Sequence, residues 1–332
     1  DLKLFANKPF KQKQDITSEI NAEIPTKETQ TDMAFRLLFS SIIYSWHTKV
    51  EQHANETPLT DEERQNVEPH YIEDFENRIE LEKTYGCTLM CYVRTPDYWF
   101  AFHIGDGKCI AFDEEGRWYE PVPWDNRCFL NKTTSLCDSS ALDEFRYCYE
   151  GDGKFPFAIV LGSDGMDDSF GETENMVNFY VQVLKLLANE CQDNALQTIK
   201  DTLPQLSKMG SKDDMSVAII YDDKILSDKV MRLISWQKNN VGDMIAKNNE
   251  RILKLRDTIS KLESKGLSSR KVMIDYQYAK TDLIRAFETK RKLAERWNKF
   301  SKELNGDDFS PWADEIGFGN TEMFESMDEG HN

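Results

Sequence analysis

Three aspartates share one kind of position, a short polar turn at the end of a predicted strand. They are Asp106 in Gly105-Asp106-Gly107, Asp164 in Ser163-Asp164-Gly165, and Asp213 in Ser211-Lys212-Asp213-Asp214. A carboxylate in such a turn is solvated and lies near free backbone N–H groups, so its ordinary role is to form an Asx turn. Each aspartate on its own has this structural explanation.

A grouping of these carboxylates would require another explanation. Asp164 and Asp213 lie beside the two most apolar predicted strands of the chain, 157–162 and 215–221. If the two strands are neighbours in a sheet, their carboxylates converge on one spot. Clustered carboxylates repel one another, so a cluster without basic residues indicates a hard divalent cation with oxygen ligands.

The segments around these turns predict a mixture of strands and helices. An antiparallel meander is expected over 88–95, 98–104 and 108–112, with a further strand from Trp118. Residues 121–150 show no periodicity and predict a long irregular excursion from the sheet. Loops of this length inside a domain tend to be functional. Apolar spacing and capping residues predict helices over 33–54 with Thr31 or Asp32 as the cap, after Thr60, over 173–191 and over 194–208.

Four motifs follow one another along the chain. They are Gly86-Cys87-Thr88-Leu89, Ile104-Gly105-Asp106-Gly107-Lys108, Val160-Leu161-Gly162-Ser163-Asp164-Gly165-Met166 and Ser211-Lys212-Asp213-Asp214-Met215-Ser216-Val217. In this order, and at these strand and turn positions, the set resembles the type 2C metal-dependent serine/threonine protein phosphatases. The resemblance is to a bacterial-type member with a C-terminal helical extension, and it covers about residues 30–222.

The resemblance implies a fold and a metal centre. The fold would be α+β, a four-layer αββα sandwich of two antiparallel sheets flanked by helices, with two or three Mg²⁺ or Mn²⁺ ions in a cleft at one end. Asp164 and Asp213 would bind the metal pair, and Asp106 would share the third ion with Asp164. Gly165 and Asp214 (where the family often has Asn) would support these ligands without binding metal. The excursion at 121–150 would take the place of the family's substrate-selecting flap.

The chain departs from the family pattern in its amino-terminal part. The family carries there a phosphate-binding arginine, an acidic metal ligand and an Asp-Gly pair that bridges both metals, often followed by a histidine. None of these is found before Gly86, and His47 and His53 lie on a predicted helix. No catalytic residue beyond the metal ligands is therefore assigned. We expect the sequence to begin just after the bridging pair, with the first strands of the sandwich upstream.

The implied activity is one-step hydrolysis of a phosphomonoester on a phosphoserine or phosphothreonine protein. Two divalent ions lower the pKa of a shared water from about 16 toward about 7. No cysteine nucleophile is needed, and Cys87 and Cys109 are predicted at or within strands. One alternative is a catalytically inactive phosphatase-like binding or regulatory module, motivated by the missing motifs. Another two-metal phosphoesterase or a nuclease is less favoured, because the negative domain would repel nucleic acid.

The composition restricts the class of protein and its partners. The 332 residues are 39% apolar and 30% charged, which excludes a collagen-like or largely disordered chain. A net charge of −18 argues against nucleic acid or an anionic membrane as a partner, and no apolar stretch is long enough to span a bilayer. Seven cysteines without a CxxC pair predict a reduced, cytoplasmic protein.

The last third of the chain predicts a separate body. From Lys224 to Lys299 apolar residues keep a four-three spacing like that of a coiled coil, and Gly266 and Ser268 divide the run into an antiparallel helical hairpin. This segment has 19 basic and 9 acidic residues, a net charge of +10. We therefore expect a phosphatase-like domain at 1–223, a basic hairpin at 224–305 and an acidic tail at 306–332. The hairpin would pack on the sandwich, dock an acidic surface or dimerise.

Overall fold

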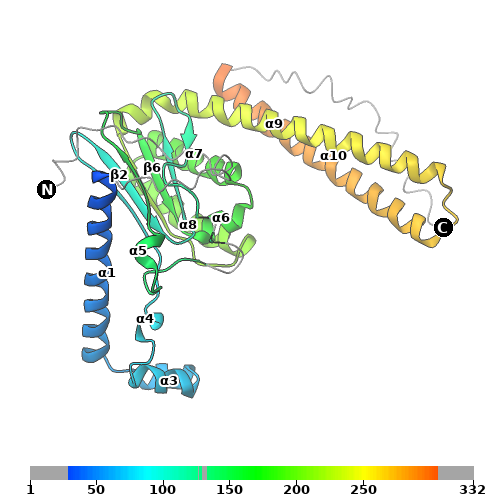
Figure 1. Ribbon diagram of the computed structural model, residues 1–332. Coiled ribbons are helices and arrows are strands. Elements are labelled where there is room, and N and C mark those ends of the chain that lie inside the picture. The colour runs from blue at the N-terminus through cyan, green and yellow to red at the C-terminus, as the bar shows by residue number, and fades with distance from the viewer. Residues whose placement is uncertain (1–28, 126, 129–132, 306–332) are drawn as a thin grey trace. The chain divides into compact units, whose positions relative to one another are not determined.

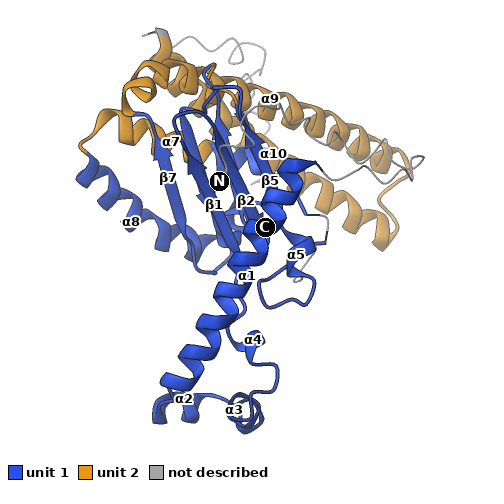
Figure 2. Ribbon diagram, turned by 60° about the vertical axis from the view of Figure 1, so that its left-hand side comes forward, with its two compact units in different colours: residues 1–114, 118–177, 192–222 blue, residues 115–117, 178–191, 223–332 orange. Residues whose placement is uncertain are grey.

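The structure is a computed structural model that describes residues 29–125, 127–128 and 133–305 (Figure 1). The predicted acidic tail lies outside the described residues. The chain divides into two compact units, of which the first holds residues 1–114, 118–177 and 192–222 and the second holds 115–117, 178–191 and 223–332 (Figure 2). No helix in the described part of the chain has the length and apolar character needed to cross a bilayer.

One antiparallel sheet of the first unit has the strand order β1-β2-β5. Its strands are β1 (Leu89–Arg94), β2 (Trp99–Ile104) and β5 (Arg146–Glu150). Every residue of the central strand β2 is buried, because both faces of this sheet are covered. Phe100, Phe102 and Ile104 pack with Phe35 and Phe39 of helix α1 (Gln30–Glu56), which runs along the outer face (Figure 2).

The second antiparallel sheet has the order β4-β3-β6-β7. Its strands are β4 (Trp118–Tyr119), β3 (Lys108–Phe112), β6 (Ala158–Gly162) and β7 (Val217–Tyr221). The inner faces of the two sheets share one apolar cluster, to which the first sheet gives Trp99, Ala101 and Cys148 and the second gives Cys109, Ala111 and Ile159. Helix α1, the first sheet and the second sheet thus form three successive layers. The predicted α+β class with two antiparallel sheets is confirmed.

Two sequence predictions about the strands are wrong. The segment 121–150 is not irregular throughout, since it contains helix α5 (Ala141–Glu144) and strand β5. Residues 215–221 do not form a fully buried strand, because β7 is the edge strand of its sheet and alternate residues such as Ala218 and Ile220 are exposed. In both cases pairing with a strand distant in sequence decides the structure.

Capping residues account for the starts of two helices. Helix α1 begins after Thr29, whose hydroxyl accepts a hydrogen bond from the Asp32 N–H while the Asp32 carboxylate accepts one from the Thr29 N–H. The cap is therefore Thr29, two residues before the predicted Thr31 and three before the predicted Asp32. Helix α2 (Asp61–Asn66) begins with the predicted capping box of Thr60 and Glu63.

Among the remaining helices up to residue 222, two were predicted, over 173–191 and 194–208, and three were not. They are α3 (Pro69–Glu76), α4 (Leu81–Thr84), α6 (Asp164–Phe170), α7 (Thr173–Asn189) and α8 (Gln192–Met209). The short helix α6, which starts directly after β6, was not predicted. Helix α7 begins in the first unit and continues from Asn178 as part of the second.

The second unit contains the predicted antiparallel helical hairpin of α9 (Asp223–Ser264) and α10 (Arg270–Asn305) (Figure 1). Gly266 adopts φ +77° in the connection, a conformation that favours glycine. The two helices share an apolar seam formed by Ile234, Val241, Ile245, Leu293 and Phe300. Near its middle, a Cβ on Gly242 would lie only 2.7 Å from the Trp297 ring, so the small residue permits close approach of the helices.

Candidate functional site

The pairing of the second sheet places the three acidic turns at one edge. Lys108 at the start of β3 pairs with Gly162 at the end of β6, and Gly162 pairs with Val217 at the start of β7. Asp106 precedes β3, Asp164 follows β6 and Asp213 precedes β7, so all three leave the sheet at the same end. The condition set by the sequence, that β6 and β7 be neighbours, is met.

Close backbone contact joins the Asp164 turn to the Asp213 turn. The Ser163 N–H donates to the Ser216 carbonyl at 3.0 Å, and the Ser216 N–H donates to Ser163 Oγ at 3.0 Å. A Cβ on Gly165 would lie 2.4 Å from the Asp214 carbonyl oxygen, so only glycine fits there. Gly165 thus allows the two turns to approach.

Hydroxyl groups hold the 211–214 turn against helix α6. Ser211 Oγ lies 2.9 Å from Ser169 Oγ and donates to the Gly165 carbonyl at 3.3 Å. Ser207 of α8 donates to the Asp213 carbonyl at 2.7 Å. The backbone that carries Asp213 is therefore fixed relative to the helix that carries Asp164.

The acidic side chains at this edge influence one another through their charges. Burial raises the pKa of Asp164 above its ordinary value, a hydrogen bond from the Gly165 N–H opposes this shift, and the charges of Asp106 and Asp213 add to it. The pKa of Asp168 is likewise raised, first by burial and then by Asp164, Asp167, Asp106 and Asp213. The charges of Asp106 and Asp213 thus act on the Asp164 carboxyl group.

Asp168 belongs to the same group, although sequence reasoning missed it. It follows Asp164 by four residues on α6, and side chains at that spacing lie on one face of a helix. The signal available in the sequence was Asp164-Gly165-Met166-Asp167-Asp168. It could have been used only if the segment had been recognised as a helix.

A lysine at the same edge stabilises the start of α6 and α7. Lys108 Nζ pairs with Asp167 Oδ1 at 2.9 Å, donates to Thr173 Oγ1 at 2.6 Å and lies 5.4 Å from the centre of the Trp124 ring. In the described part of the chain Asp106, Asp164, Asp168 and Asp213 form no salt bridge. No described basic side chain is therefore paired directly with these carboxylates.

The donor set fits a hard divalent cation in its chemistry. Carboxylate oxygens are the ligands that Mg²⁺ and Mn²⁺ prefer, and uncompensated, partly buried carboxylates gain most from such a cation. Across residues 29–125, 127–128 and 133–305, no three Asp, Glu, His or Cys side chains are grouped closely enough to share one ion. The roles of Asp106, Asp164 and Asp213 as ligands, and of Gly165 and Asp214 as their supports, stay predictions.

Comparison with known proteins identifies the family. The profile described as protein phosphatase 2C matches residues 20–203, more than half of the chain. The chain belongs to the protein phosphatase 2C family. The matched residues include Asp106, Asp164 and Asp168, and Asp213 follows the matched segment in the turn before β7.

The other comparisons add less to this assignment. A crystal structure of a bacterial serine phosphatase bearing a point substitution is 15% identical in sequence, and the alignment covers 47% of this chain and 68% of that one with a TM-score of 0.30. This likeness is too distant to carry the assignment, which rests on the family profile. A search of curated proteins found no match.

Proposed function

We propose that this phosphatase 2C domain hydrolyses phosphoserine and phosphothreonine esters of proteins with the help of divalent metal ions. The observation that carries the proposal is the convergence of Asp106, Asp164 and Asp213 at one edge of the second sheet, in a chain of this family. We propose further that the domain is built as the four-layer αββα sandwich typical of the family.

The residues of the chain would have distinct roles. Asp164 and Asp213 would hold a pair of Mg²⁺ or Mn²⁺ ions, and Asp106 with Asp164 would hold a third. These ions would provide a nucleophile at neutral pH and offset the negative charge of the phosphoryl oxygens. Gly165 keeps the Asp164 and Asp213 turns in contact, and the Asp214 backbone carbonyl packs directly on it.

The substrate would be selected beside this edge. The segment 121–150 reaches it, since the exposed ring of Trp124 lies 5.4 Å from Lys108 Nζ. An exposed aromatic ring next to a lysine offers apolar contact and positive charge to a phosphorylated peptide. We therefore assign this segment to substrate recognition.

The test is Mn²⁺-dependent release of phosphate from phosphoserine and phosphothreonine peptides. Because no Asp-Gly pair precedes Asp106 in this sequence, we expect a low rate from this chain. Asp164→Asn should lower the rate by about a hundredfold or more, since the ions contribute several kcal/mol. Asp97→Asn, at a turn on another strand connection, is the matched control and should leave the rate unchanged.

Two results would contradict the proposal. Equal rates for the wild type and Asp164→Asn would exclude the metal site. Binding of phosphopeptides without hydrolysis by any form of the protein would favour the phosphatase-like binding module instead.

The helical hairpin is proposed to bind an acidic protein surface. Lys247, Arg251 and Lys254 lie on one exposed face of α9. Binding through them should weaken as salt rises toward about 0.5 M, and after all three are changed to Glu. An unchanged salt response and an unchanged mass in solution after this substitution would contradict the idea.

A further inference from the structure

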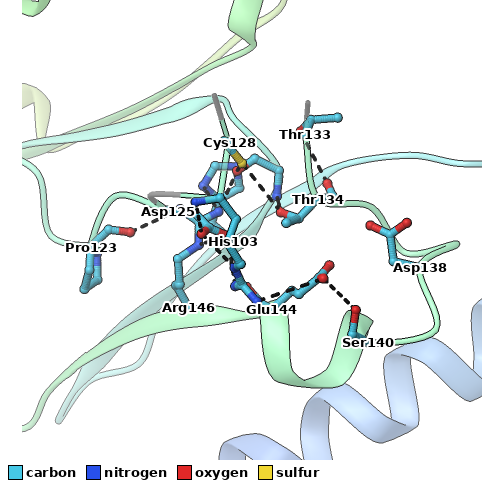
Figure 3. Close-up of polar contacts among 12 residues, drawn as sticks. His103, Pro123, Asp125, Cys128, Thr133, Thr134, Asp138, Ser140, Glu144 and Arg146 are labelled. Atoms are coloured by element: carbon cyan, nitrogen blue, oxygen red, sulfur yellow. Dashed lines mark hydrogen bonds and ion pairs between the residues drawn. The ribbon is translucent and has the colours of Figure 1, made fainter. Parts of the chain in front are cut away.

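A polar cluster binds the backbone of Gly105, the residue that precedes Asp106. Figure 3 shows its members Cys128, Thr134 and Arg146. The Gly105 N–H donates to Thr134 Oγ1 at 3.0 Å. The Gly105 carbonyl accepts from Arg146 Nη2 at 2.5 Å and from the Cys128 thiol at 3.5 Å. All three partners come from the segment 121–150, so this segment holds both polar backbone groups of Gly105.

Arg146 is itself held in place from several sides. It lies opposite His103 in the β2–β5 pairing, and its Nη2 is 3.3 Å from His103 Nδ1. Its Nη1 donates to the Pro123 carbonyl at 3.1 Å, and its Nε lies 3.6 Å from Asp125 Oδ2. Only 12% of the Arg146 side chain and 5% of the Asp125 side chain are exposed, so this is a mostly buried ion pair.

A second arginine fixes the counter-ion. Arg127 binds the Asp125 carboxylate with Nε at 2.9 Å and Nη2 at 3.0 Å, and its backbone N–H adds a third hydrogen bond. Burial opposes the charge of Asp125, but the hydrogen bonds from Arg127 outweigh it and lower the pKa of the carboxyl group. Asp125 is therefore a rigid, ionised partner for Arg146.

The Gly105 turn has little freedom to move away from these contacts. Gly105 adopts φ +118°, and a Cβ there would lie 2.4 Å from Thr88 Cγ2. At Gly107 a Cβ would lie 2.7 Å from the Gly162 carbonyl. The turn is packed on Thr88 before Asp106 and on β6 after it, and the hydrogen bonds at Gly105 fix its remaining orientation.

Arg146 also acts on Asp106 through its charge. Burial lowers the pKa of Arg146, and the negative charges of Asp125 and, more weakly, Asp106 oppose that shift. The guanidinium group is thus within electrostatic range of the Asp106 carboxylate.

We propose that Arg146 is a positioning residue for Asp106, which it orients toward Asp164 by fixing the Gly105 carbonyl. Asp125 and Arg127 hold Arg146 for this task, and Thr134 fixes the Gly105 N–H. The inference rests on the proposed function, since it treats Asp106 as a ligand of a divalent ion. It would also link the proposed substrate-recognition segment to the proposed metal centre, because Cys128, Thr134 and Arg146 belong to that segment.

The test is Mn²⁺ binding to the whole chain, measured by electron paramagnetic resonance of the free ion. Asp106→Asn defines the part of the binding that depends on Asp106. Arg146→Met should weaken that part about tenfold, the usual effect of losing a group that orients a metal ligand. Arg146→Lys keeps the charge and one donor and should recover part of the loss.

Two further variants separate positioning from general destabilisation. Cys148→Ala, two residues along β5, removes a buried side chain without touching Gly105 and should leave Mn²⁺ binding unchanged. Thr134→Val removes the acceptor of the Gly105 N–H with little change in shape and should weaken binding in the same direction as Arg146→Met. In the Asp106→Asn background, Arg146→Met should have less than about a twofold effect, because coupled residues are not additive.

The outcomes distinguish the inference from the function on which it rests. If the wild type and Asp164→Asn bind Mn²⁺ alike, the metal site fails and the inference fails with it. If Asp164→Asn abolishes binding but Arg146→Met and Thr134→Val bind as the wild type does, the metal site stands and the inference is overturned. If Arg146→Met does not fold, Thr134→Val is measured in the wild type and in the Asp106→Asn variant. Weaker Mn²⁺ binding in the wild type alone supports the inference, and unchanged binding in both overturns it.

Discussion

The glycine before Asp106 shows how one residue type can be required twice, by its φ angle and by its surroundings. Gly105 has φ +118°, and the Thr88 side chain occupies the place where a Cβ would point. The sequence motif that contains it is therefore a packing constraint as well as a signature of the family.

Gly105→Ala should consequently destabilise the fold by about 2–4 kcal/mol, because steric overlap and backbone strain add. The free energy of unfolding from urea titration measures this. Gly153→Ala is the matched control, since Gly153 also has a positive φ of +79° but nothing within 4 Å of its Cβ position. Its cost should be about 1 kcal/mol, and equal costs for the two variants would show that Thr88 does not matter.

His103 makes stability depend on pH. Burial, and secondly the charge of Arg146, lower the pKa of His103 to about 3, while Asp125 opposes the shift. The unfolded chain has a histidine pKa near 6.5, so on acidification it binds the proton before the folded state does. Stability is therefore lost as pH falls below about 6.5, and the loss continues toward about pH 3.

At pH 5 this loss should amount to about 2 kcal/mol relative to pH 7. His103→Gln cannot titrate and should have a flatter profile of unfolding free energy over this range. The exposed His70, changed in the same way, serves as the control. Parallel profiles for the wild type and His103→Gln would refute the assignment.

At the scale of the element, the second unit joins the end of α7 to the helical hairpin through polar contacts. Lys185 of α7 pairs with Glu303 of α10 at 2.6 Å, and its ammonium group lies 5.4 Å from the centre of the Phe300 ring. The Lys185 side chain is 12% exposed, so solvent screens this pair only in part. Gln237 of α9 donates to the Asn178 carbonyl of α7 at 3.3 Å in the same region.

A double-mutant cycle of Lys185→Met and Glu303→Gln should give a coupling energy of about 1 kcal/mol. The exposed pair Lys261 and Asp257 within α9, also 2.6 Å apart, provides the control and should give about 0.3 kcal/mol. Urea titration of the single and double variants gives both values. If the coupling energy of Lys185 and Glu303 is no larger than that of the control pair, the partial burial of Lys185 does not strengthen the ion pair.

The elements also show what the sequence can and cannot predict. The ends of β1, β2 and β3 were predicted to within one residue, because alternating side chains and turn residues are local signals. Strand β5 was missed because its charged ends, Arg146 and Glu150, suit a strand only when β2 lies beside it. Helix α6 was missed because seven residues with three aspartates carry no apolar period.

The candidate site likewise contains residues with a local sequence signal and residues that depend on distant contacts. The turn aspartates could be proposed as site residues because each follows or precedes a recognisable strand. Asp168 was missed together with α6, and Arg146 was missed because its partners Gly105 and Asp125 lie 41 and about 20 residues away in the chain. Contacts between distant segments are set by the topology, which no local pattern contains.

At the scale of the whole molecule, charge is the dominant property. The chain has a net charge of −18, and the acidic turns concentrate part of it at one edge of a sheet. A divalent cation bound there would remove repulsion that exists only in the folded state. Binding should therefore stabilise the protein as a whole.

Mn²⁺ should raise the melting temperature of the wild type, with a gain of about 2.7 kcal/mol at a concentration a hundred times the Kd. Asp164→Asn should abolish most of this gain, and Asp97→Asn should preserve it. Thermal unfolding followed by circular dichroism measures the effect. A gain of the same size in all three proteins would indicate non-specific binding of the ion.

The thiols facing each other between the two sheets have a practical consequence. Burial raises the pKa of Cys148 to about 12 and that of Cys109 further, so at neutral pH neither forms the thiolate that electrophilic dyes attack. Cys87 in the first unit and Cys191 in the second are exposed. Maleimide fluorophores should therefore attach first to these two natural positions, and energy transfer between them would report the separation of the units in solution.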